Sequence, residues 1–186
     1  MNFITFIIVF VLIWLCILIL TILGMYLWSE AKHYFYHQAP TVGTYRSHYI
    51  LMRNQLKLPK WSSLIDLWCG DGGVLRFMSD TYQLSLLDGV DNNLTAIWRW
   101  KFLNYLFNKE NIHLHYGDIK DIDLSKYDII YMFLLPHHLD NLQDRLQKNM
   151  KSDAIIVCNT FVFSDREPYQ ILRSDDTKSV MRLYKK

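Results

Sequence analysis

A doubly wound α/β domain with a mainly parallel sheet is the fold that the sequence predicts for residues 63–186. Three observations predict it. Short apolar runs typical of strands alternate with helix-like runs between Ser63 and Asn159. A glycine-containing turn, Cys69-Gly-Asp-Gly-Gly73, leads from the first of these runs into a helical stripe. Two more strand-like runs close the chain, with no room for a helix between them.

The first element, Phe3–Leu27, is expected to be a transmembrane helix because it is apolar throughout and carries no charge. About 20 apolar residues span a bilayer core. A cleaved signal peptide and a buried core helix are the alternatives. A signal peptide has a charged start and roughly 7–15 apolar residues, whereas this run is longer, lacks an early Lys or Arg, and offers only Ser29-Glu30-Ala31 for cleavage. We therefore predict an anchor at residues 1–28, with these aromatic residues at the membrane interface: Tyr26, Trp28, Tyr34, Phe35 and Tyr36.

The charge around the anchor predicts its orientation. Residues 29–60 contain five basic side chains and one acid, Glu30, and a basic flank favours the cytoplasmic side. Only Lys32 and Arg46 lie close to the anchor. We predict a single-pass membrane protein with its domain on the cytoplasmic, or an equivalent reducing, side.

Residues 29–62 are expected to form a linker and a helix. Pro40 interrupts a polar stretch, and the apolar residues that follow recur at helical spacing until Pro59: Tyr45, Tyr49, Met52 and Leu56.

The domain at 63–186 follows. Five strands are expected at 63–68, 84–90, 112–116, 127–134 and 154–159. Helical stripes separate them: Val74, Phe77 and Met78; then Leu94, Ile97, Trp98, Phe102, Tyr105 and Leu106; then Leu139, Leu142, Leu146 and Met150. The runs at 169–173 and 179–184 should pair as an antiparallel hairpin at one edge. The predicted fold is thus a Rossmann-like, seven-stranded sheet.

Composition excludes several classes of protein. The chain has 20 basic and 18 acidic residues, all beyond residue 28, which excludes disorder, collagen and a polytopic membrane protein. The net charge of +2, without a basic stripe, argues against a nucleic-acid binder. Cys16, Cys69 and Cys158 form neither a disulfide framework nor a metal-ligand spacing, so we expect a reducing compartment and no metal.

Three acids mark the predicted ligand site, because ligands bind beyond the carboxyl ends of parallel strands. Asp66 ends the first strand, ahead of a glycine loop whose backbone can approach a ligand closely. Asp91 ends the second strand and could accept the hydrogens of a ribose diol. Asp118 follows the third strand and could accept from an exocyclic adenine amine. Each acid alone could be a solvated loop residue or a helix cap. Together with the loop they predict a nucleotide-like site.

Residues 63–186 resemble the class I, seven-stranded S-adenosylmethionine-dependent methyltransferases. Their Asp-x-Gly-x-Gly-x-Gly loop is represented by Asp66-Leu-Trp-Cys-Gly70-Asp-Gly72. More narrowly, the chain is similar to small membrane-anchored protein-lysine methyltransferases that act on mitochondrial carrier or ATP-synthase rotor subunits. The anchor, the Ala39-Pro-Thr-Val-Gly-Thr44 stretch and the loop carry that similarity.

The resemblance implies S-adenosyl-L-methionine as cofactor and a lysine of a membrane-associated protein as acceptor. It places the cofactor against residues of the linker, the loop and the second and third strand ends: Thr44, Asp66, Leu67, Cys69, Gly70, Asp71, Gly72, Asp91, Asn92, Asp118 and Ile119. Tethering fits such an acceptor, since confinement to one surface raises effective concentration toward ~mM. A lipid or quinone headgroup would fit the same geometry.

One departure from the family loop is Trp68, which stands where the first glycine is expected. An indole there either clashes with the cofactor unless the loop shifts, or points into the domain and packs. A catalytically degenerate relative that binds a partner or serves as a scaffold is therefore the alternative to an active enzyme.

Two other enzymes are disfavoured. A nicotinamide dehydrogenase needs a small residue where this chain has Leu75, and the terminal hairpin fits it poorly. Adenine methyltransferases resembling this fold carry Asn/Asp-Pro-Pro-aromatic after the fourth strand, where this chain has Leu135-Pro-His-His138. His137 and His138 are weak catalytic candidates that could accept a proton on the acceptor side, or they are merely solvated loop residues.

Overall fold

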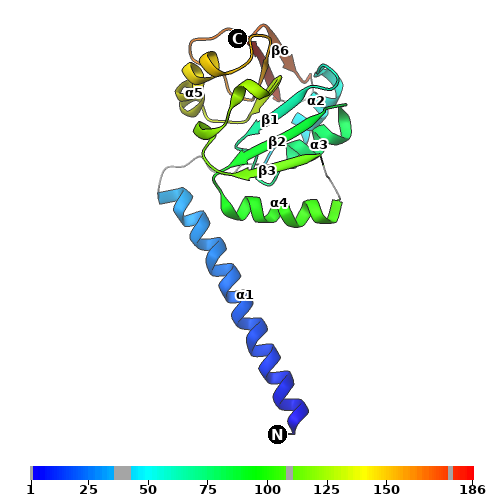
Figure 1. Ribbon diagram of the computed structural model, residues 1–186, viewed down its shortest axis with the longest axis vertical. Coiled ribbons are helices and arrows are strands. Elements are labelled where there is room, and N and C mark those ends of the chain that lie inside the picture. The colour runs from blue at the N-terminus through cyan, green and yellow to red at the C-terminus, as the bar shows by residue number, and fades with distance from the viewer. Residues whose placement is uncertain (1, 36–42, 108–110, 176–177) are drawn as a thin grey trace. The chain divides into compact units, whose positions relative to one another are not determined.

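The computed structural model describes residues 2–35, 43–107, 111–175 and 178–186 (Figure 1). The chain divides into two compact units, Met1–Pro40 and Thr41–Lys186. The Ala39-Pro-Thr-Val segment and Tyr36 lie outside the described residues, as do details of the Tyr34 and Phe35 side chains.

The first unit contains one long helix, α1, at Phe3–Phe35. Within it, Phe3–Trp28 is long and apolar enough to cross a membrane, and none of it is buried inside the protein. The helix continues past the apolar run for about two turns, and the apolar side chains of that run are exposed.

The second unit is built on a seven-stranded sheet of order β3-β2-β1-β4-β5-β7-β6. The first five strands are parallel, whereas β7 runs antiparallel to both β5 and β6. Their bounds are β1 Ser63–Leu67, β2 Leu86–Asp91, β3 Ile112–Tyr116, β4 Ile129–Met132, β5 Ile155–Asn159, β6 Gln170–Arg173 and β7 Val180–Lys185. The predicted doubly wound sheet with a carboxyl-terminal hairpin is confirmed.

Both faces of this sheet are buried, because alternate strand residues point into two separate apolar clusters. Leu64 and Tyr131 lie in one apolar cluster, with residues of α2 (Arg46–Gln55), α3 (Gly73–Thr81) and α4 (Leu94–Phe107). Ile65 and Ile130 lie in the other, with α5 (Pro136–Asn149) and the two 3-10 turns, η1 (Ile119–Asp121) and η2 (Leu124–Lys126). Because consecutive residues of a strand point to opposite faces, an apolar run is buried on both sides.

Two helices differ from their prediction. Helix α5 begins at Pro136, one turn before the apolar stripe, so His137 and His138 lie in its first turn rather than in a loop. Proline is favoured there because its missing N–H has no partner within a helix start. Helix α4 buries Ile97 and Trp100, but the remainder of its expected stripe faces outward and is exposed: Leu94, Trp98, Phe102, Tyr105 and Leu106.

Candidate functional site

Two of the three predicted acids meet at the carboxyl ends of β1 and β2. Asp66 is 2% exposed and Asp91 is 4% exposed. The Asp91 carboxylate accepts hydrogen bonds from the backbone N–H of Gly70 (2.8 Å) and of Asn93 (2.7 Å). The backbone carbonyl of Asp91 accepts from the N–H of Gly117 at 3.1 Å. Asp91 therefore joins the loops that follow β1, β2 and β3.

Asp66 is a buried carboxylate beside a second acid. Burial, followed by the charge of Asp91, raises the pKa of Asp66 well above its usual range. Among the described residues, no hydrogen bond or ion pair involves the Asp66 carboxylate. A buried acid such as Asp66, which is raised in pKa and lies beside a second acid, favours a ligand that brings positive charge.

The loop between β1 and α3 has three residues in the left-handed region: Trp68 (φ 66°), Gly70 (φ 55°) and Gly72 (φ 70°). Glycine adopts this region freely, whereas a side chain there costs about 1–2 kcal/mol. At Gly72 a Cβ atom would lie 2.7 Å from Cδ1 of Trp100, so the backbone here packs directly against α4. The two glycines are required by the turn itself.

Trp68 has a left-handed backbone conformation, which glycine adopts freely and other residues rarely do. Its N–H donates to the carbonyl of Val90 at 2.9 Å, which holds the loop on β2. Its indole is mostly buried and packs against the apolar cluster on the α5 face. There it meets the ring of His138 edge-on, with 4.8 Å between the ring centroids.

The Asp71 side chain is engaged by two arginines. Its carboxylate lies 3.5 Å from Arg76 of α3 and 3.3 Å from Arg99 of α4. It also accepts from the N–H of Gly73 at 3.2 Å. In this arrangement Asp71 fixes the beginning of α3.

The other predicted site residues differ in how deeply their side chains are buried. The side chains of Leu67, Cys69 and Ile119 lie in the core, so a ligand could meet Leu67 and Cys69 only through their backbone. Burial raises the pKa of the Cys69 thiol. Asn92 is partly exposed. Asp118 is exposed, and its carboxylate caps η1 by accepting from the N–H of Lys120 at 2.9 Å.

Helix α2 lies beside the glycine loop. Tyr49 packs against Phe77 of α3, with ring centroids 4.9 Å apart and the rings tilted by 54°, and its hydroxyl lies 3.2 Å from where a Cβ of Gly73 would be. Burial raises the pKa of Tyr49, and a hydrogen bond with Thr44 opposes that rise. Thr44 also forms a hydrogen bond with Tyr131 of β4. Thr44 thus connects α2 to the strands beneath the loop.

A polar chain that the sequence did not predict lies at the ends of β4 and β5. Asn159 Nδ2 donates to the Tyr131 hydroxyl at 2.9 Å, and the Thr160 hydroxyl contacts both Asn159 (3.2 Å) and Nε2 of His48 (3.1 Å). His48 is 5% exposed, and burial lowers its pKa. Thr160 is left-handed, with φ 66°.

The predicted histidines lie on the α5 side of this edge. His137 is exposed and shares a 3.2 Å hydrogen bond with Asn141 of the same helix. His138 is half-buried against Trp68, and burial lowers its pKa. Neither is brought to Asp66 or Asp91 by a hydrogen bond within the described part of the chain.

No local signal in the sequence points to His48, Tyr131 or Thr160. They come from α2, β4 and the loop after β5, and only the position of Thr160 just after a strand could have drawn attention to it.

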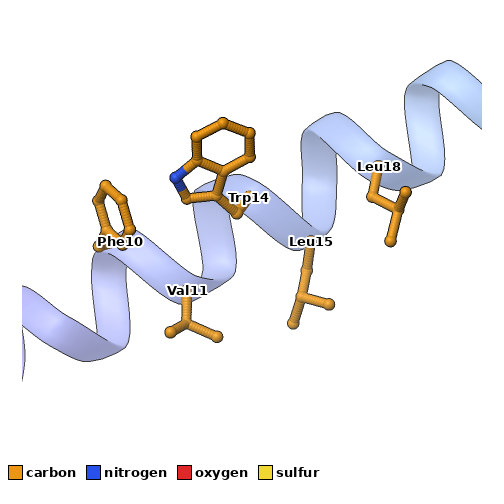
Figure 2. Close-up of a pocket in the computed structure, with 5 residues that line it drawn as sticks. All are labelled: Phe10, Val11, Trp14, Leu15 and Leu18. Atoms are coloured by element: carbon orange, nitrogen blue, oxygen red, sulfur yellow. The ribbon is translucent and has the colours of Figure 1, made fainter.

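An apolar hollow lies on α1 (Figure 2). It is lined by residues of three successive turns: Phe10, Val11, Trp14, Leu15 and Leu18. These side chains offer no charged group, so this surface suits another apolar surface rather than a charged cofactor. Among the described residues, no group of three or more His, Cys, Asp or Glu could hold a metal ion.

The residues at the strand ends fit the expected cofactor. S-adenosylmethionine is a nucleoside with cationic centres, and the site offers two buried acids side by side, Asp66 and Asp91. The left-handed Gly70 and Gly72 leave backbone rather than side chains along the loop. The residues that would hold it are Asp66, Asp91 and the loop backbone.

Comparisons with known proteins identify the family of the chain. Residues 66–170, more than half of the chain, match the family model described as ANTKMT methyltransferase domain. The chain is 24% identical over 131 residues to a protein-lysine N-methyltransferase of Saccharolobus islandicus (strain REY15A), covering 68% of this chain and 81% of that protein.

Solved structures with the same fold include two methyltransferases. One is an RNA methyltransferase from Salinibacter ruber in complex with S-adenosyl-L-homocysteine, with TM-score 0.69, 16% identity, and coverage of 77% of this chain and 93% of that one. The other is a ribosomal protein L11 methylase from Lactobacillus delbrueckii subsp. bulgaricus, with TM-score 0.59, 12% identity, and coverage of 78% and 81%. The chain therefore belongs to the ANTKMT methyltransferase domain family and is a class I S-adenosylmethionine-dependent methyltransferase.

Proposed function

We propose that this enzyme methylates a lysine of a protein held at the membrane that Phe3–Trp28 spans. The enzymatic part of the proposal depends on Asp66, a buried acid of β1 that lies beside Asp91 and has no hydrogen-bond or ion-pair partner among the described residues. The family match and the similarity to a protein-lysine methyltransferase support a lysine acceptor. The length and composition of the apolar helix support the membrane location.

When bound, S-adenosylmethionine supplies an electrophilic methyl group on a sulfonium. The chain's own part is to bind and to orient. Asp66 and Asp91 attract a cationic ligand into a site of low dielectric, where charge interactions are stronger than in water. The Gly70 and Asn93 N–H groups hold the Asp91 carboxylate in place, so the site is ordered before the ligand arrives.

The acceptor lysine is proposed to enter above the ends of β4 and β5. Phe133 and Phe161 stack there with centroids 5.9 Å apart, and His48 lies 6.3 Å from Phe133. An aromatic surface of this kind can pack against the aliphatic part of a lysine side chain. Burial lowers the pKa of His48, so its imidazole stays neutral at physiological pH and does not repel the incoming amine.

The test uses the full chain in lipid nanodiscs, with isotopically labelled S-adenosylmethionine and a membrane extract as the source of acceptors. We expect labelled methyl groups on lysine in membrane proteins, detected by mass spectrometry. Asp66→Asn should abolish labelling, whereas Asp123→Asn, an exposed carboxylate that caps η2, should leave it unchanged.

Two results would contradict the proposal. Label in a lipid or quinone fraction, with none on protein lysine, would overturn the acceptor. Cofactor binding without transfer to any component would overturn the enzymatic role and favour a scaffold.

A further inference from the structure

The outer face of α4 is apolar, continuous and exposed. Five side chains form it, and we call them the α4 stripe: Leu94 (44% exposed), Trp98 (60%), Phe102 (63%), Tyr105 (85%) and Leu106 (57%). At about 100° per residue, they cover roughly 120° of the helix surface. Soluble proteins rarely leave a contiguous apolar surface of this kind uncovered.

All the charged residues of α4 are basic. Arg99 and Lys101 lie on the two flanks of the α4 stripe by helical position, both are exposed, and residues 94–107 contain no acid. The Arg99 side chain is 71% exposed even while it contacts Asp71. Aromatic residues flanked by basic ones are typical of helices that lie in the headgroup region of a bilayer.

The opposite side of α4 is used by the fold. Ile97 and Trp100 are buried against the sheet face that α4 shares with α3. The α4 stripe is therefore not a core face that has failed to pack. Helix α4 packs beside β3, the edge strand of the sheet.

The covalent tether keeps the domain close to the surface that α1 enters. From Trp28, where the apolar run ends, α1 continues to Phe35, which adds roughly 10 Å at 1.5 Å per residue. The chain from Phe35 to Arg46 can span at most about 40 Å, at roughly 3.6 Å per residue. A domain of this size is about as wide as that distance. It can therefore always reach the bilayer.

We propose that the α4 stripe docks into the lipid surface of the same membrane, so that helix α4 lies in the interface with its aromatic side chains among the headgroups. The inference rests on the proposed membrane anchor and extends it. A bilayer is the occupant because the stripe is convex, aromatic and flanked by cations, and because the tether presents it to lipid at high effective concentration. Docking would fix the site above one leaflet, where a membrane-bound lysine is within reach.

The experiment uses the full chain in nanodiscs that contain a phospholipid with a photoactivatable carbene precursor near its headgroup. After illumination, labelled peptides are identified by mass spectrometry. We expect the peptide of residues 94–107 to be labelled at least about fivefold more than the peptide of residues 169–173. The latter is a matched control, because Tyr169 and Ile171 are also exposed and belong to the opposite edge of the sheet.

A variant separates lipid contact from chance proximity. Trp98→Ser, Phe102→Ser and Tyr105→Ser together change only exposed side chains, so the fold should persist, as circular dichroism can verify. Labelling of 94–107 should fall to the level of the control peptide. Removing anionic lipid should also lower labelling in the unmodified chain, because Arg99 and Lys101 lose their attraction to the surface.

The α1 peptides distinguish the two proposals. Labelled α1 with unlabelled α4 would overturn the docking while the anchor stands. If neither is labelled, the anchor itself fails, and the docking fails with it. If an added protein cross-linker joins the α4 stripes of two chains, or α4 to a protein partner, while the lipid probe leaves α4 unlabelled, the docking is also overturned.

Discussion

Replacing Trp68 with glycine tests whether the indole supports the loop or blocks the cofactor. The residue has the left-handed φ of 66°, and its side chain packs against the α5-face cluster and His138. Trp61 provides a matched control. It is also a left-handed tryptophan, with φ 62°, but 72% of it is exposed.

The expected change in stability follows from three contributions. Glycine relieves backbone strain of about 1–2 kcal/mol, but it costs about 0.5–1 kcal/mol in the entropy of the unfolded chain. In the folded chain the mostly buried indole keeps roughly 150 Å² of apolar surface away from water, which stabilises the fold by about 4 kcal/mol. Trp68→Gly should therefore destabilise the domain by about 3 kcal/mol and lower Tm by about 6–12 °C. Trp61→Gly should change Tm by less than about 3 °C, because little burial is lost.

Differential scanning fluorimetry of the detergent-solubilised chain measures Tm, and isothermal titration with S-adenosylmethionine measures Kd. We expect Kd of Trp68→Gly to stay within about threefold of the unmodified chain, since the indole packs on the α5 side. A tenfold gain in affinity would show that the indole occupies cofactor space. An unchanged Tm would show that it is not packed.

Three further outcomes are expected. Because the pKa of Asp66 is raised, the folded chain holds the proton of this carboxyl group more tightly than the unfolded chain does. The stability of the fold should therefore fall as the pH rises from the ordinary carboxyl range through the raised pKa. In Asp66→Asn this fall should vanish and Tm at neutral pH should rise, as melts across pH will test. Over the same window, calorimetry should find cofactor affinity rising with pH as Asp66 ionises. Gly72→Ala should cost about 2–4 kcal/mol, because its Cβ would lie 2.7 Å from Trp100 at a positive φ. In denaturant melts Gly73→Ala should cost clearly less, because its Cβ would lie no nearer than 3.2 Å to the Tyr49 hydroxyl and would need no positive φ.

The strands were predictable because they are apolar and short. Ile112–Tyr116 matches its predicted range, and the others differ by at most a few residues at their ends. Their parallel direction follows from the helices between them, and parallel neighbours bring Asp66 and Asp91 to the same edge of the sheet.

The inward and outward faces of α4 were not predictable. This helix is apolar nearly all round, so the spacing that indicates a helix does not indicate which face is buried. The start of α5 was missed because the stripe begins at Leu139, whereas Pro136 sets the first turn.

The contacts of His48 with Thr160 were also beyond prediction. They join residues 112 positions apart, and no periodicity encodes such a pairing. The same applies to the direction of the Trp68 indole. It packs against His138, which is far away in the sequence.

The different roles of Asp66 and Asp91 have a consequence for relatives that have lost activity. The Asp91 carboxylate joins the loops after β1 and β2 by hydrogen bonds, so a chain that no longer binds a nucleoside still needs this side chain for its fold. Asp66 weakens the fold, and only a cationic ligand compensates for it. Drift to a neutral residue at the Asp66 position is therefore the earlier mark of a pseudoenzyme, while an intact acid at the Asp91 position says little about catalysis.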